Sequence, residues 1–201
     1  MGKFILGILV GFVLVLIGAY FVFNTGRFPT SVYGAPLPFE KKWAMRNIHA
    51  RADREAPKGG PFQATEADFT AGAQGYRDHC AVCHGLPNIA KTAIAKGEYP
   101  PPPPLWQGTG VTDDPPGETY WKLANGIRMT GMPGFGKTLP DKQLWQISFL
   151  LATERDKLPP SAIAILNRPP AVDNPGGAAS QQVPANAPNT PQLDHPGQHK
   201  H

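Results

Sequence analysis

The stretch Cys80-Ala81-Val82-Cys83-His84 decides how the rest of this chain is interpreted. C-x-x-C-H is the signature for covalent attachment of a c-type haem. Two thiols add across the haem vinyl groups as thioethers, and the adjacent histidine coordinates the iron. The chain has only 2 cysteines, so this motif uses both. We therefore predict one covalent haem c, attached at Cys80 and Cys83, with His84 as an axial iron ligand.

Two other interpretations of the cysteine pair fit the chain less well. A thiol–disulfide redox pair normally accompanies a βαβ pattern, and the sequence shows no strand pattern. A zinc site needs four protein ligands, and no second Cys/His pair follows at the usual spacing.

A low-spin haem needs a sixth iron ligand on the face opposite His84. Met132 lies between Gly131 and Pro133, in a loop whose glycines and prolines can press a thioether onto the iron. A thioether ligand raises the reduction potential. Met132 is the predicted ligand and Met129 its nearest competitor. The remaining candidates are Met45, His49 and His79.

Composition favours one small domain with extended segments. The 201 residues include 24 prolines and 22 glycines, and only 17% are charged. About 100 residues then form the folded domain. The net charge of +4 is modest, and the absence of a basic cluster with interleaved aromatic residues argues against a nucleic-acid partner.

The N-terminus carries a membrane-spanning pattern. Phe4 to Phe23 has no charged side chain, and a helix of that length spans a bilayer core of about 30 Å. The run exits at Asn24-Thr25-Gly26-Arg27 without a convincing cleavage site. We predict a retained anchor over 1–23; a cleaved signal peptide is the alternative.

Residues 24–64 are predicted to be a linker that contains an amphipathic helix over Phe39–Arg54. One face carries Lys41, Lys42, Arg46 and Arg51. This helix either lies on lipid headgroups or packs on the downstream domain, and the sequence leaves both open.

Three helices are expected in a haem domain over 65–158. The first follows the capping pattern Thr65-Glu66-Ala67-Asp68 and runs to about Cys80. A short helix covers Glu118–Asn125, and a last one starts after Thr138 and ends near Glu154. Residues 159–201 are rich in Pro, Ala, Asn and Gln and are predicted to be a disordered tail.

Residues 65–154 resemble the class I cytochrome c family. The resemblance rests on the helix with Gly72 and Tyr76 that leads into the C-x-x-C-H motif, on Asn125–Pro133, and on the closing helix Leu139–Phe149. It implies an all-α haem domain, here with one N-terminal transmembrane helix and a Pro-rich tail. In that family the methionine before the proline, here Met132, ligates the iron.

The resemblance also implies contacts around the haem. The first and last helices cross, and Gly72 is expected against Trp145 or Phe149. The carbonyl of Pro103 or Pro104 is expected to accept a hydrogen bond from the ligand imidazole, which raises its basicity. Arg128 either pairs with a haem propionate or is solvated. The expected pocket residues are Pro104, Leu105, Trp121, Ile127, Arg128 and Phe135.

These features predict an electron carrier, not an enzyme. Haem is attached to such motifs outside the cytoplasm in bacteria, which implies a single-pass protein of the inner membrane with its haem domain in the periplasm. Its partners are then redox proteins of a respiratory chain; a small-molecule substrate is not expected. A permanent subunit of a membrane dehydrogenase or oxidase is the first alternative. A gas sensor or peroxidase is the second and would need an open sixth position.

Overall fold

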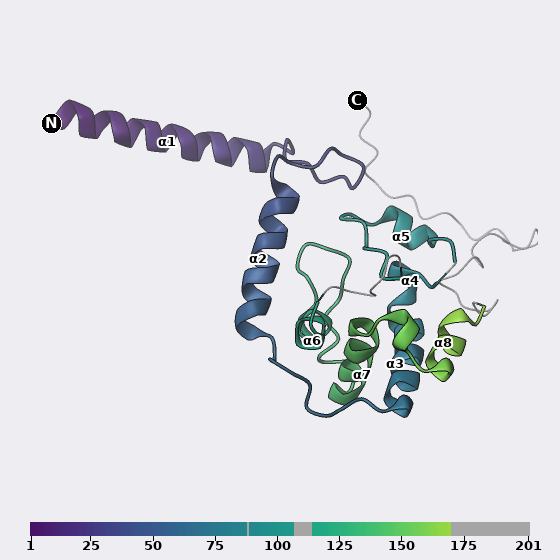
Figure 1. Ribbon diagram of the computed structural model, residues 1–201. Coiled ribbons are helices and arrows are strands. Elements are labelled where there is room, and N and C mark those ends of the chain that lie inside the picture. Colours follow the sequence, from purple (N-terminus) through teal and green to yellow (C-terminus); the bar gives the residue numbers. More distant parts are fainter. Residues whose placement is uncertain (88, 107–113, 170–201) are drawn as a thin grey trace, which may run out of the picture.

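The chain folds into helices only, over the residues that the structure describes. A computed structural model describes residues 1–87, 89–106 and 114–169, and no strand occurs among them. The elements are α1 (Gly2–Asn24), α2 (Glu40–Glu55), α3 (Glu66–His79), α4 (Ala81–His84), α5 (Ala93–Gly97), α6 (Pro116–Asn125), α7 (Asp141–Ala152), the 3-10 turn η1 (Arg155–Lys157) and α8 (Pro160–Asn167) (Figure 1). The expected all-α class is confirmed.

Helix α1 leads away from the folded domain and makes no packing contact with it (Figure 1). Its mean hydropathy over an 18-residue window is 2.8, and none of its residues is buried. By length and composition it is the one helix of the described residues that can cross a membrane. An anchor and a signal sequence both have these properties.

Helix α3 starts where the capping pattern predicts. The Thr65 hydroxyl accepts from the backbone N–H of Asp68, and the Asp68 carboxylate accepts from the backbone N–H of Thr65 at 3.0 Å. Gln146 of α7 donates to the same carboxylate at 3.0 Å. These hydrogen bonds, that of Gln146 foremost, hold the pKa of Asp68 well below its usual range. Asp68 therefore both caps α3 and links α3 to α7.

The core forms where α3 crosses α7. Gly72 lies against the backbone of Gln146, and a Cβ added at Gly72 would come 2.8 Å from the Gln146 carbonyl carbon. The expected crossing is thus correct. The atoms nearest to Gly72 are backbone atoms of Gln146 and Ile147, where the resemblance led us to expect the ring of Trp145 or Phe149. The buried side chains around this crossing include Ala73, Tyr76, Leu144, Ile147, Leu150 and Leu151.

The two aromatic residues expected against Gly72 pack on other elements. Trp145 stacks on Tyr120 of α6, with ring centroids 4.3 Å apart. Phe149 meets Phe62 edge to face at 5.3 Å. At the point where α3 and α7 come closest, a small residue thus lies against backbone. The large rings of Trp145 and Phe149 fill the space on either side.

Helix α8 corrects the prediction of a disordered tail from residue 159. Ala162 and Leu166 are buried against α3 at 0% and 1% exposure. The Arg77 guanidinium of α3 donates to the carbonyls of Ile165 (3.1 Å) and Arg168 (2.6 Å) at the end of α8. The folded domain therefore extends to about residue 169. The rest of the predicted tail, 170–201, lies outside the described residues.

Helix α2 packs on the domain through α6. Ala52 is fully buried, and His49 Nδ1 lies 3.2 Å from Glu118 Oε1. The indole Nε1 of Trp121 donates to Glu55 at 3.1 Å. The structure thus places one face of α2 on the domain, one of the two positions that the sequence left open.

Candidate haem-binding site

The C-x-x-C-H motif occupies the junction of α3 and α4. Cys80 ends α3 and is 6% exposed within the core, whereas Cys83 is partly exposed. The backbone N–H groups of Cys83 and His84 donate to the Cys80 carbonyl at 3.1 and 2.9 Å. This turn brings the two thiols and the imidazole to one place, as the spacing predicts.

Cys80 and Cys83 form no disulfide with each other. Burial raises the pKa of Cys80 to about 12, and burial together with Glu98 raises that of Cys83 to about 11. The attacking cysteine of a thiol–disulfide centre needs a lowered pKa. The electrostatics therefore argue against the redox-pair interpretation.

The imidazole of His84 is held by backbone. Its Nδ1 lies 3.0 Å from the carbonyl oxygen of Pro103. A carbonyl only accepts, so Nδ1 carries the proton and Nε2 keeps its lone pair for a metal. The sequence left Pro103 and Pro104 open for this bond. The structure assigns it to Pro103, and Pro104, the predicted pocket residue, is exposed.

The loop after α6 folds back on the end of that helix. Ile127 N–H donates to the Met132 carbonyl at 3.2 Å, and Phe135 N–H donates to the Leu123 carbonyl at 2.8 Å. Gly126 has φ +65°, and a Cβ there would lie 2.5 Å from the nitrogen of Gly134. A glycine is required at this close approach.

The two methionines of this loop have different surroundings. Met132 is partly buried and packs against the core cluster that contains Cys80. Its backbone N–H donates to Thr130 Oγ1 at 3.1 Å. Met129 has φ +64° and is 89% exposed. Only Met132 of this pair has its thioether among the side chains that pack beside the motif.

Glu98 links the two sides of the site. Cys83 Sγ donates to Glu98 Oε1 at 3.1 Å, and a Cβ on Gly131 would lie 2.7 Å from the same oxygen. The C-x-x-C-H turn and the Met132 loop are therefore neighbours through this carboxylate. No motif marks Glu98 in the sequence, because its position depends on how the loop before the proline run is folded.

The predicted pocket residues divide into three groups. Leu105 and Phe135 pack against the core cluster, and Ile127 is partly exposed in the loop that carries Met132. Trp121 is instead turned with its Nε1 toward α2. Pro104 and Arg128 are exposed. The helix α6 has a domain face and an α2 face, which the sequence alone does not distinguish for Trp121.

Trp106 supplies an independent test of the predicted cofactor. Its ring meets Tyr76 edge to face at 5.1 Å, and Tyr76 in turn donates to the Gly85 carbonyl at 2.7 Å. The Trp106 Nε1 is buried near the Tyr76 hydroxyl and makes no hydrogen bond of ordinary geometry with a described residue. A buried donor normally has a partner. A haem propionate is a carboxylate acceptor of the kind that this donor needs, so the residues present fit the group.

The comparison with known families agrees with this site. Residues 67–148, from α3 into α7, match the family described as cytochrome C oxidase, cbb3-type, subunit III. Residues 67–148 are a class I c-type cytochrome domain. No curated protein matches the chain.

The matched range contains both parts of the predicted site, the C-x-x-C-H turn and the Met132 loop. A cytochrome domain of this kind binds haem c and transfers electrons. The helix α1, which lies outside the matched range, is apolar enough to be a membrane anchor or a signal sequence.

Proposed function

We propose that this protein is a membrane-anchored monohaem electron carrier of the bacterial periplasm. Cys80 and Cys83 would hold one haem c through thioether bonds, with His84 and Met132 as the axial ligands of the iron. The bound haem supplies a reversible one-electron Fe(III)/Fe(II) couple. The helix α1 would be retained as a single-pass anchor that keeps the domain near respiratory redox partners.

The hydrogen bond between His84 Nδ1 and the Pro103 carbonyl carries this proposal. It fixes the imidazole tautomer, so that Nε2 keeps its lone pair for a metal. A histidine kept only for packing or for a surface charge needs no such orientation. Leu105, Phe135 and Met132, which pack against the core cluster that contains Cys80, would give the haem an apolar lining.

The partly buried thioether of Met132 favours a carrier over a sensor or a peroxidase. Those two classes need an exchangeable sixth position. Met132 would fill that position, and its backbone is tied to both Ile127 and Thr130.

An absorption spectrum tests the proposal. The full-length chain, matured in a bacterial periplasm, is measured oxidised and reduced, with and without carbon monoxide. A reversible low-spin spectrum that carbon monoxide leaves unchanged is expected. A reduced form that binds carbon monoxide readily would overturn the carrier assignment in favour of a sensor or an enzyme.

A permanent subunit of a membrane oxidase is the second candidate. The observation that favours it is the matched family, whose description names a subunit of a cbb3-type oxidase. Extraction in mild detergent separates the two candidates. Stoichiometric partners that co-purify through a salt wash indicate a subunit, and a chain that purifies alone indicates a carrier.

A further inference from the structure

The two long faces of α2 have different surroundings. The face at Ala52 is on the domain, tied by His49 to Glu118 and by Glu55 to Trp121. The start of the helix is tied as well. Burial raises the pKa of Tyr99, and so does the Glu40 carboxylate, which accepts a hydrogen bond from the Tyr99 hydroxyl. The helix is therefore fastened to the domain from its first turn to its last.

The opposite face of α2 is exposed and is both aromatic and cationic. At 3.6 residues per turn, Trp43 and Arg46 lie on the side of α2 away from Ala52, with Lys42 beside them. Phe39, the residue before the helix, has φ +64° and joins this side through its contact with Trp43. Phe39 and Trp43 are 66% and 65% exposed, and their rings stack with centroids 6.4 Å apart. We call these four residues the outer face of α2.

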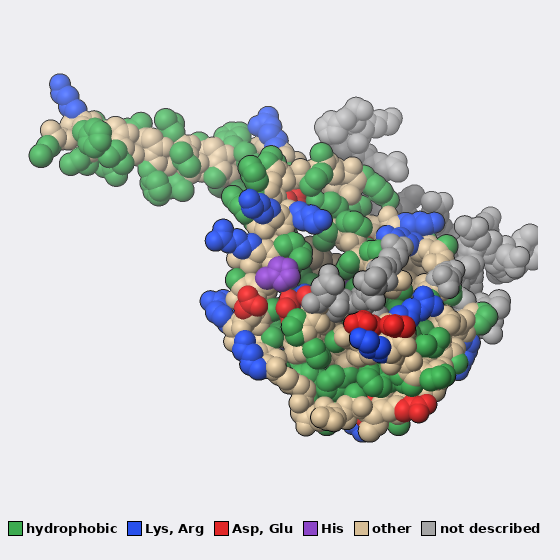
Figure 2. Space-filling view, in the orientation of Figure 1, with side chains coloured by type: hydrophobic (Ala, Val, Ile, Leu, Met, Phe, Trp, Pro, Cys, Tyr) green, Lys and Arg blue, Asp and Glu red, His purple; other side chains and the backbone are tan. Residues whose placement is uncertain are grey.

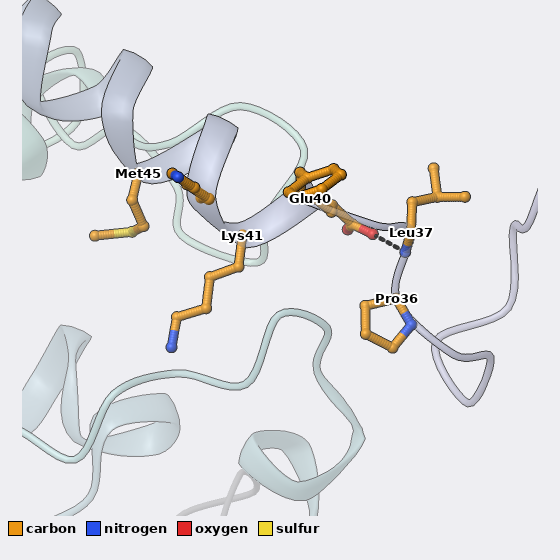
Figure 3. A pocket seen from close by; sticks show the side chains of 7 residues that line it. Pro36, Leu37, Glu40, Lys41 and Met45 are labelled. Carbon is orange, nitrogen blue, oxygen red and sulfur yellow. Dashed lines mark hydrogen bonds between the residues drawn. The ribbon is translucent and has the colours of Figure 1, made fainter.

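The side of α2 nearer the domain has a different character. Figure 3 shows Lys41 and Met45 projecting from one side of the helix, beside a shallow groove. Pro36 and Leu37 line this groove together with Phe39 and Lys42, so it borders the outer face. Glu40 Oε2 accepts from the Leu37 backbone N–H at 2.8 Å, which fixes the incoming loop to the first turn of α2 (Figure 3). The chain that arrives from α1 is thus tied to the start of α2.

The direction of α1 indicates what covers the outer face. In Figure 1, α2 runs crosswise to α1 and lies at the edge of the domain nearest to it. If α1 crosses a bilayer along its normal, α2 lies parallel to the bilayer surface. Figure 2 shows Lys and Arg side chains gathered along this same edge, on the side toward α1.

We propose that the outer face of α2 lies on anionic lipid headgroups, so that the domain is held against the membrane in one orientation. Trp side chains with one polar edge favour the membrane interface, and Lys and Arg are attracted to acidic lipids. Among the acidic residues of α2, Glu40 and Glu55 are engaged with the domain at Tyr99 and Trp121. The third, Asp53, is exposed on the side of Lys42 and Arg46 near the end of the helix, so these two cations leave the outer face with a net positive charge. This proposal rests on the retention of α1 as an anchor, which belongs to the proposed function.

Quenching of Trp43 fluorescence by brominated lipid tests the contact. The full-length haem-loaded protein is placed in nanodiscs of phosphatidylglycerol, with bromine near the glycerol end of the acyl chains or without bromine. The difference between the wild type and Trp43→Phe isolates the emission of Trp43. Brominated lipid is expected to remove most of this difference in phosphatidylglycerol and much less of it in phosphatidylcholine at high salt. Trp43 emission that aqueous iodide quenches and brominated lipid does not would overturn the proposal and indicate a face open to water or to a protein.

Charge reversal supplies the matched comparison. The variant Lys42→Glu/Arg46→Glu is expected to lose the lipid quenching of Trp43. The control Lys91→Glu/Lys96→Glu makes the same change of charge at exposed residues at and before α5 and is expected to keep it. Equal quenching in both variants would contradict the role of the outer face.

Polarised absorption of the haem in aligned phosphatidylglycerol bilayers decides the question where Trp43 emits too weakly. A common orientation of the haem relative to the bilayer, seen as a difference in absorption between the two polarisations, is expected in the wild type and in the Lys91→Glu/Lys96→Glu control. The difference is expected to be lost in Lys42→Glu/Arg46→Glu. Equal order in all three, or none in the wild type, would overturn the proposal. Retention in the membrane fraction after a salt wash is measured separately. A protein that the salt wash releases from the membrane has no anchor, and this result contradicts the proposed function and not only the role of α2.

Discussion

Gly72 of α3 lies directly against the backbone carbonyl of Gln146 in α7. A methyl group at this position would come 2.8 Å from the carbonyl carbon and closer still to the oxygen. Backbone on both sides leaves no flexible side chain to move aside, so the two helices would have to separate.

Gly72→Ala is therefore expected to destabilise the domain. Inserted groups in a close-packed core typically cost about 1–3 kcal/mol. Denaturant unfolding of the haem-loaded protein, followed by circular dichroism, measures the loss. Gly59→Ala is the matched control, because a Cβ there meets nothing within 4 Å. Equal stability of the two variants would show that α3 and α7 can separate without cost.

The hydrogen bonds of Asp68 let us predict how the stability of the domain depends on pH. Its folded-state pKa is lowered, chiefly by the hydrogen bond from Gln146 and next by those from Thr65. A lowered pKa contributes stability that is present above the unfolded value, here 3.8, and is lost as pH falls through the folded value. The wild type is thus expected to lose stability below about pH 3.8 more steeply than Asp68→Asn.

The free energy of unfolding, measured from pH 6 down to pH 2, checks the Asp68 prediction. The Asp68→Asn variant is expected to be less stable at pH 6 and to change less on acidification. Asp78→Asn, on the solvent side of α3, controls for the loss of one negative charge. Parallel pH curves for the wild type and Asp68→Asn would contradict the assigned tie between α3 and α7.

Local patterns predict the elements that surround the site. The capping box at Thr65 marks the start of α3, and the C-x-x-C-H spacing marks the turn that joins Cys80 to His84. Both signals lie within a few consecutive residues. Features set by contacts between distant segments are harder to predict from the sequence. Trp121 is an example, because the direction of its side chain depends on a contact with Glu55 of α2, 66 residues earlier.

Two further predictions differ from the structure, each for its own physical reason. Five consecutive prolines present five similar carbonyls, so no local signal separates Pro103 from Pro104 as the partner of His84. The composition after residue 158 suggests disorder, yet Pro160 at a helix start and the i, i+4 pair Ala162 and Leu166 are a helix signal. The average over the whole tail hides this signal.

Leu166→Ala tests the packing of α8. Leu166 is 1% exposed in the core, and a buried Leu→Ala change typically costs about 2–5 kcal/mol. The measurement is the midpoint of thermal unfolding of the haem-loaded chain, with the exposed neighbour change Asn167→Ala as control. A Leu166→Ala midpoint equal to that of Asn167→Ala would mean that α8 is not part of the cooperative domain.

The contrast between Met132 and Met129 predicts which thioether reaches the iron. Met132 packs among core side chains, whereas Met129 is 89% exposed three residues earlier. Met132→Ala is expected to leave the haem attached, because Cys80 and Cys83 are unchanged, and to let the reduced form bind carbon monoxide. The reduction potential should fall by an amount on the order of 0.1 V, since axial ligands set potentials over a range of roughly 0.8 V. Met129→Ala, the matched control, should change neither property when potential and carbon monoxide binding are measured by redox titration and absorption. Carbon monoxide binding by Met129→Ala, with an unchanged spectrum for Met132→Ala, would reverse the ligand assignment.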